Sequence, residues 1–264
     1  ISLAMMIFVL APAVAPLLGQ KIMVIYGWRA IFTACMFAGL LAFLWMSIRQ
    51  KETLILEKRT PFLISNIISG YKTIFTNKRV IISTSVQASV LGGLFSYIAS
   101  APQIFTQWLN AEEQFPIYFC CIALISAFSN IINATLVERL GMWVMSTFAI
   151  GFNMIFSAII YLVLYMEIVS DIYLLPIFLI WSVVVFLTMA MSIGNLMALA
   201  MEPVGHIAGL AASIIGSTST LISILLAIPI GMMFDGTGMP LIASITILAI
   251  TAFGLNIINP RSAN

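Results

Sequence analysis

The residues with the most reactive side chains are few and scattered. His206 is the single histidine, and the three cysteines, Cys35, Cys120 and Cys121, lie inside apolar runs. Thiols in such runs are expected to be free and buried, and to pack as small hydrophobic groups. No carboxylate pair lies inside an apolar run, and no nucleophile is paired with the histidine. We therefore predict no enzyme activity, no metal site and no bound cofactor. His206 has the chemistry of a pH sensor, but a solvated loop histidine is the commoner case.

Polar side chains inside the apolar runs offer a different chemistry. Gln87 and Tyr97 lie in the run that begins at Val80, and Asn153 lies near the middle of a later run. A polar side chain at membrane depth is costly unless it faces protein or water. These three residues are therefore candidates for lining a substrate cavity. The alternative is an interhelical hydrogen bond, worth about 1 kcal/mol, and the sequence leaves both interpretations open.

The elements that carry these residues are predicted to be membrane-spanning helices. The chain has 264 residues, of which 62% are hydrophobic and 8% charged, with a mean hydropathy of +1.15. Soluble domains are about 25% charged. Long continuous apolar runs favour helices over barrel strands, and a spanning helix needs about 20 residues. We predict an all-α polytopic membrane protein with eight spans: 2–24, 30–48, 80–102, 115–137, 142–166, 172–201, 205–234 and 239–258.

One long polar interval, residues 49–79, fixes the expected orientation. It holds seven of the eleven basic residues: Arg49, Lys51, Lys58, Arg59, Lys72, Lys78 and Arg79. Cytoplasmic loops of membrane proteins carry the excess of Lys and Arg, so we place this interval in the cytoplasm. Alternating the spans then puts both ends of the chain on the cytoplasmic side. A net charge of +2 with one basic loop gives no basic face for nucleic acid.

The same interval is predicted to contain a helix of its own. Thr60 followed by Pro61 is typical of a helix start. Apolar residues then recur at helical spacing up to Phe75, which predicts an amphipathic helix at the cytoplasmic surface. A plain linker between two halves of the protein and a specific lipid site are the two interpretations.

Prolines and glycines mark two spans as bending helices. Pro12 and Pro16 lie on one helix face, each removes a backbone donor, and Gly19 follows them. Pro229 and Gly231 repeat this pattern more weakly near the end of the seventh span. The spacing fits a helix that bends at a moving interface, and it fits a kinked packing helix equally well.

These motifs resemble the drug-efflux transporters of the major facilitator superfamily, most closely the Bcr/CflA group. The segment Ala11-Pro12-x-x-Ala15-Pro16-x-x-Gly19, followed by Gly27-Trp28-Arg29, resembles the fifth helix and the outer loop after it, although Gln20 stands where the family usually has a second glycine. Residues 97–102, Tyr-x-x-Ser-Ala-Pro, resemble the seventh helix, which lines the central cavity. Residues 195–209 resemble the join between helices ten and eleven.

The turn Glu138-Arg139-Leu140-Gly141 resembles a degenerate copy of the charged Arg/Gly loop that this superfamily places between helices eight and nine. The resemblance implies that Glu138, Arg139 and Gly141 form a cytoplasmic latch between neighbouring helices. A solvated loop is the alternative.

The resemblance implies a twelve-helix fold in which this chain supplies helices five to twelve. Residues 1–48 would be the last two helices of the N-terminal half, 49–79 the linker between halves, and 80–264 the six-helix C-terminal half. The implied protein is a monomer in the bacterial inner membrane, with the lipid bilayer and small drug molecules as its partners. We expect four further helices before Ile1.

The implied function is export of small lipophilic drugs by proton antiport and alternating access, driven by the proton gradient. Family members carry the proton-coupling acid and a characteristic arginine in helices one to four, so we expect no coupling residue here and no transport by this chain alone. A non-transporting helical membrane protein, or a decayed transporter fragment, is the alternative.

Overall fold

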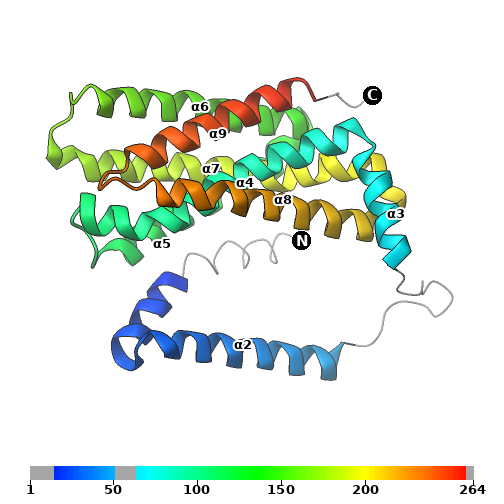
Figure 1. Ribbon diagram of the computed structural model, residues 1–264, viewed down its shortest axis with the longest axis horizontal. Coiled ribbons are helices and arrows are strands. Elements are labelled where there is room, and N and C mark those ends of the chain that lie inside the picture. Colours follow the sequence, from blue (N-terminus) through cyan, green and yellow to red (C-terminus); the bar gives the residue numbers. More distant parts are fainter. Residues whose placement is uncertain (1–14, 51–63, 260–264) are drawn as a thin grey trace.

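The computed structural model describes residues 15–50 and 64–259, and within these ranges the chain is helical without a strand (Figure 1). A helix over residues 15–26 comes first. The elements that follow are α2 (Trp28–Arg49), α3 (Ile64–Phe75), α4 (Lys78–Gln103), the π-helix η2 (Ile104–Trp108), α5 (Phe115–Leu140), α6 (Met142–Tyr165), the 3-10 helix η3 (Asp171–Tyr173), α7 (Leu174–Met201), the 3-10 helix η4 (Glu202–Ile207), α8 (Ala208–Met232) and α9 (Met239–Ile257).

The predicted all-α membrane fold is confirmed. In the described ranges, six helical stretches are long and apolar enough to cross a membrane, and one of them, Asp171–Met232, contains both α7 and α8 joined through η4. The helices α2 and α4 to α9 therefore match the seven predicted spans from residue 30 onward. The predicted span 2–24 is described only from residue 15, so Pro12 lies outside the described residues.

Two helix ends differ from the prediction because charged residues continue the helices. α4 begins at Lys78, since the Asn77 side chain accepts hydrogen bonds from the backbone N–H groups of Arg79 (2.9 Å) and Val80 (3.3 Å). α5 runs on through Glu138 and Arg139 to Leu140. The predicted charged turn is therefore the last turn of α5.

The helices α4 to α9 form a bundle whose contacts repeat with two-fold symmetry. α4 packs against α8 as α7 packs against α5, and α4 packs against α9 as α7 packs against α6. α4 also meets α7, and α6 meets α9. Each repeat contains three spans, which is an odd number, so the second repeat starts from the opposite side of the membrane. The pattern is therefore that of an inverted repeat. α2 lies apart from this bundle and has no buried residue (Figure 1).

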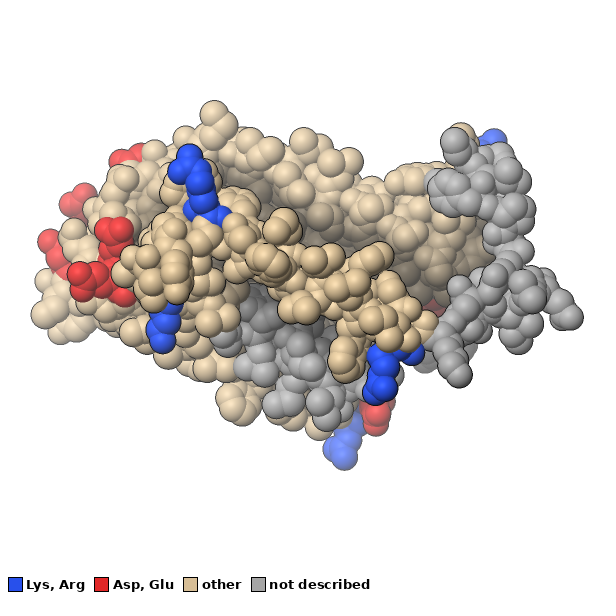
Figure 2. Space-filling view, turned by 90° about the horizontal axis from the view of Figure 1, so that it is seen from below, with Lys and Arg blue, Asp and Glu red and all other residues tan. Residues whose placement is uncertain are grey.

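Charged side chains of α3 to α9 and of the loops between them lie at the two ends of the bundle. We call the end where α4 begins the basic end; Lys72, Lys78, Arg79 and Arg139 lie there. The loops at the opposite, acidic end carry Glu112, Glu113, Glu167, Asp171 and Asp235, and Figure 2 shows acidic atoms gathered at one end of the molecule. Which end faces the cytoplasm stays a prediction, as does the division of the chain at residues 48 and 79.

The bundle interior changes in character along its length. Toward the acidic end it is an aromatic core that includes Tyr97, Phe105, Phe119, Phe178 and Trp181. At the basic end a smaller aliphatic cluster joins α3, α4, η4 and α8. The three cysteines are free, as predicted, but Cys35 and Cys121 are exposed on apolar helix faces. The prediction of burial was wrong for these two because a spanning helix presents apolar residues to lipid as well as to protein.

Close helix contact depends on glycine at a few positions. A Cβ atom on Gly151 of α6 would lie 2.8 Å from Cε2 of Phe253 on α9, which is too close, whereas one on Gly92 of α4 would lie at an ordinary 3.4 Å from Leu226 on α8. Small residues let backbones approach where no hydrophobic drive joins helices in lipid. The contact between α6 and α9 is therefore the one at which a larger residue would disturb the packing more.

We expect Gly151→Ala to lower the free energy of unfolding by about 1–3 kcal/mol, because the Phe253 ring must move out of its packed position. The measurement is the thermal unfolding midpoint in detergent. Gly254→Ala is the matched control: it is the residue after Phe253, and its Cβ would meet no atom within 4 Å. Equal melting temperatures for the two variants would contradict the packing.

Candidate functional site

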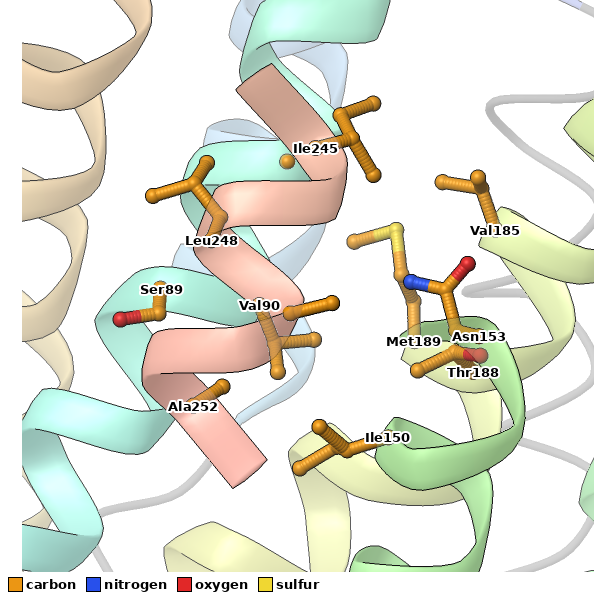
Figure 3. A pocket seen from close by; sticks show the side chains of 12 residues that line it. Ser89, Val90, Ile150, Asn153, Val185, Thr188, Met189, Ile245, Leu248 and Ala252 are labelled. Atoms are coloured by element: carbon orange, nitrogen blue, oxygen red, sulfur yellow. The ribbon is translucent and has the colours of Figure 1, made fainter. Parts of the chain in front are cut away.

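Asn153 lies on a small internal cavity between α4, α6, α7 and α9 (Figure 3). The cavity measures about 20 Å³, and its lining includes Gly93, Asn153, Thr188, Met189, Ile245 and Ala249. Figure 3 shows the amide nitrogen of Asn153 turned toward this space. A void of this size holds a water molecule, whereas sites for drug-sized ligands measure roughly 300–1,000 Å³. This cavity is therefore too small for a drug in the arrangement described.

A short chain of hydrogen bonds holds Asn153 in place. The Ser157 hydroxyl donates to Asn153 Oδ1 at 3.1 Å, and the indole N–H of Trp181 on α7 donates to Ser157 Oγ at 2.9 Å. All three side chains are buried. A buried indole N–H needs an acceptor, so Ser157 joins α6 to α7 as well as orienting Asn153.

Tyr97 belongs to the aromatic core and is absent from the lining of that cavity. Its side chain is fully buried, its ring stacks on Phe178 with centroids 6.0 Å apart, and Phe186 meets it edge-on at 5.2 Å. The ring of Trp181 lies 6.2 Å from it. The structure thus connects Tyr97 with Asn153 through Trp181, and a substrate-lining role for Tyr97 stays a prediction.

Gln87 is separate from the other two candidates. It is buried on α4, but the cavity around Asn153 is lined from α4 by Ser89, Val90 and Gly93 and not by Gln87. Its Oε1 atom accepts no hydrogen bond from the described residues. Within the described ranges, this oxygen of Gln87 therefore makes no interhelical hydrogen bond. A place for Gln87 on a substrate cavity stays a prediction.

Asparagine side chains join the helices toward the basic end. Asn195 of α7 donates to Asn133 of α5 at 2.8 Å, and the reverse bond measures 3.4 Å. Asn256 of α9 donates to Thr147 of α6 at 2.8 Å, and Asn259 donates to Ser83 of α4 at 2.9 Å. Sequence reasoning missed these pairs, although an asparagine inside an apolar run is the signal for such a bond.

The ion pair found at the basic end differs from the predicted latch. Arg79 at the start of α4 pairs with Glu202 at the start of η4, which ties α4 to the join between α7 and α8. Glu138 and Arg139 are exposed on the last turn of α5. Gly141 adopts φ +83°, so the turn itself requires glycine. The Arg79–Glu202 ion pair therefore joins these elements at the basic end, and a latch formed by Glu138, Arg139 and Gly141 stays a prediction.

The predicted kinks do not coincide with the irregular points of the helices. α8 runs unbroken through Pro229, and a Cβ on Gly231 would lie at an ordinary 3.5 Å from Ala99. Pro16 and Gly19 lie in the helix over residues 15–26, where a Cβ on Gly19 would meet nothing within 4 Å. Regular α-geometry ends instead just after Pro102, where α4 passes into η2. A gating role for the proline and glycine positions stays a prediction.

One face of α8 presents hydroxyl groups to the outside of the bundle. Ser213, Ser217 and Thr220 are all exposed, and their spacing of four and three places them on one side of the helix. Ser213 and Ser217 donate to backbone carbonyls three residues earlier, at 2.9 and 3.1 Å. We call these three residues the hydroxyl face of α8. The sequence alone did not indicate this orientation.

The fold and these polar positions define a polytopic helical membrane protein. The sequence profile of the Major Facilitator Superfamily matches residues 1–227, so the chain belongs to this family of membrane transporters. The uncharacterized MFS-type transporter YdgK of Bacillus subtilis is 26% identical over 255 residues, which cover 94% of this chain and 61% of that protein. A bicyclomycin resistance protein homolog of Haemophilus influenzae is 26% identical over 137 residues, covering 52% of this chain and 34% of the relative.

The chain thus spans less than two thirds of the length of either relative. The match to a transporter family confirms the resemblance to the major facilitator superfamily that was stated from the motifs.

We expect Ser157→Ala to lower the free energy of unfolding by about 1–3 kcal/mol, because it leaves the buried Trp181 N–H without its acceptor. The measurement is a double-mutant cycle with Trp181→Phe, read as thermal unfolding in detergent. Once the indole is gone, Ser157→Ala should cost clearly less. Strictly additive effects would show that the bond contributes nothing.

Proposed function

We propose that the chain is part of a secondary transporter that exports small lipophilic drugs along a pathway bordered by α8. The observation that carries this proposal is the hydroxyl face of α8, Ser213, Ser217 and Thr220, which points away from the six-helix bundle. The next exposed positions on the same helix, Leu221 and Leu225, are apolar. The exposed surface of α8 therefore changes from hydroxyl groups in its first half to apolar side chains in its second half.

Polar side chains at membrane depth face protein or water in preference to lipid. The hydroxyl face lies in the first half of a helix of 25 residues, within a candidate span. Since the bundle does not cover it, we place it against the substrate pathway or against further helices that border that pathway. Rocking of two helix bundles about a central site is the general mechanism of such transporters.

The chemistry of this face suits an uncharged, lipophilic substrate. Hydroxyl groups offer weak donors and acceptors, and the described residues of the spans carry their charges only near the two ends of the bundle. Resistance to bicyclomycin appears in the name of one relative, which supports a drug as cargo. For proton antiport, the described part of the six-helix bundle offers no carboxylate at membrane depth, so we place the coupling acid elsewhere in the transporter.

By the same proposal the protein works as a monomer in a bacterial plasma membrane. Both matched relatives are bacterial. The basic end would face the cytoplasm, because Lys and Arg are retained on that side.

The test is drug susceptibility of a sensitive bacterial host that expresses this chain with all coding sequence that adjoins it in its gene. We expect lower susceptibility to at least one lipophilic drug class. Ser217→Leu should reduce the protection against the drug roughly tenfold. This change corresponds to about 1.4 kcal/mol in the free energy of drug binding or in the barrier to its passage. The matched control is Leu225→Ala, at an exposed apolar position in the second half of the same helix.

Membrane abundance of each variant is measured in parallel, so that a loss of protein is not read as a loss of transport. Unchanged susceptibility across several drug classes, at good membrane abundance, would contradict drug export and favour a non-transporting membrane protein. Equal effects of Ser217→Leu and Leu225→Ala would contradict the role given to the hydroxyl face.

A further inference from the structure

The helix α3 has three distinct faces, and the first is docked on the bundle. Gly70 and Ile74, four residues apart, form this docked face. A Cβ on Gly70 would lie 2.4 Å from Cδ2 of Leu210 on α8, so only glycine fits without a shift. Ile74 is fully buried in a cluster with Val204 and Ile215. The position of α3 on α4 and α8 is therefore set by side-chain packing.

The second face of α3 is apolar and uncovered. Ile68 is 63% exposed, Tyr71 is 41% exposed and Phe75 is partly buried. Their spacing of three and four places them in one stripe along the helix. The rings of Tyr71 and Phe75 stack with centroids 5.7 Å apart. We call these three residues the apolar stripe of α3.

The third face is polar. Ser69, Thr73 and Thr76 are exposed and repeat at a spacing of four and three. Lys72 is exposed and lies between this face and the apolar stripe. It is three or four residues from Ser69 and Thr76 of the polar face, and equally three or four residues from Ile68 and Phe75 of the stripe. A lysine at such a border extends its charge toward water while its stem covers apolar surface.

The apolar stripe is continuous with exposed apolar residues of α8. The Tyr71 hydroxyl lies 3.5 Å from the Thr218 hydroxyl on α8. One turn beyond Thr218, Leu221, Ile222 and Leu225 are exposed by 60%, 37% and 61%. Because these residues belong to a candidate membrane span, lipid tails are their expected neighbours. The stripe extends that surface toward the basic end.

We propose that α3 lies at the boundary of the bilayer, with its apolar stripe among the lipid headgroups and upper acyl chains, and that Lys72 binds the phosphate of an anionic lipid. A helix with one face on protein, one apolar and one polar fits the place where bundle, lipid and water meet. Charge supports an anionic partner, since residues 49–79 carry seven basic and two acidic side chains. Basic segments of this kind beside a span attract anionic lipids.

The proposal is tested in nanodiscs with the full chain, after replacing Cys35, Cys120 and Cys121 by serine. An environment-sensitive fluorophore is attached to Ile68→Cys on the apolar stripe or to Thr73→Cys on the polar face, which is the matched control. We expect a lipid spin label near the headgroup to quench the fluorophore at position 68 roughly threefold more than at position 73. Aqueous iodide should show the reverse order.

The anionic preference is tested by comparing spin-labelled phosphatidylglycerol with spin-labelled phosphatidylcholine as quencher at position 68. Lys72→Gln should lower the preference for phosphatidylglycerol by roughly fivefold, the effect of one lysine near the surface, and Lys72→Arg should retain it. A position 68 shielded from both quenchers would mean that protein covers the stripe and would overturn the proposal. An unchanged preference in Lys72→Gln would overturn the lipid site at Lys72.

Discussion

The hydrocarbon of a bilayer supplies no hydrogen-bond partner, and this constraint governs where each polar group of the chain lies. Backbone groups are satisfied within helices, and the charged side chains of α3 to α9 and of the loops between them lie at the two ends of the bundle. Hydroxyls such as Ser126 and Ser182 donate to carbonyls one turn back. Amides find partners across helices, as in the Asn133–Asn195 pair. The hydroxyl face of α8 places three exposed hydroxyls on one side of a helix, and two of them, those of Ser213 and Ser217, also donate to carbonyls of the same helix.

Packing in this environment depends on shape more than on the removal of apolar surface from water. Gly151 allows the close approach of α6 to α9. The aromatic core around Tyr97 fills the acidic half, whereas asparagine pairs and the Arg79–Glu202 ion pair join helices at the basic end. The two halves of the bundle thus differ in their main contacts, although the Ser157–Trp181 hydrogen bond also joins α6 to α7 beside the aromatic core.

The fold was predictable from the sequence because each charge-free run has the length of a spanning helix. The positions and types of seven helices followed from that rule, although Asn77 and the charged last turn of α5 moved two of their ends. The partners of the polar residues were not predictable. Asn153 reaches Ser157 within its own helix, but the bond continues to Trp181 on α7. Likewise, no local pattern indicates that Arg79 pairs with Glu202, 123 residues away.

The central claim is that the hydroxyl face of α8 borders an aqueous or substrate-filled pathway while the exposed apolar residues in the second half of the helix, such as Leu225, face lipid. Its most direct test is the rate at which a membrane-impermeant thiol reagent modifies Ser217→Cys and Leu225→Cys in the complete, otherwise cysteine-free transporter. The account predicts fast modification at position 217, slowed by a bound drug, and little modification at position 225. Equal rates at the two positions, or modification of position 225 alone, would contradict it.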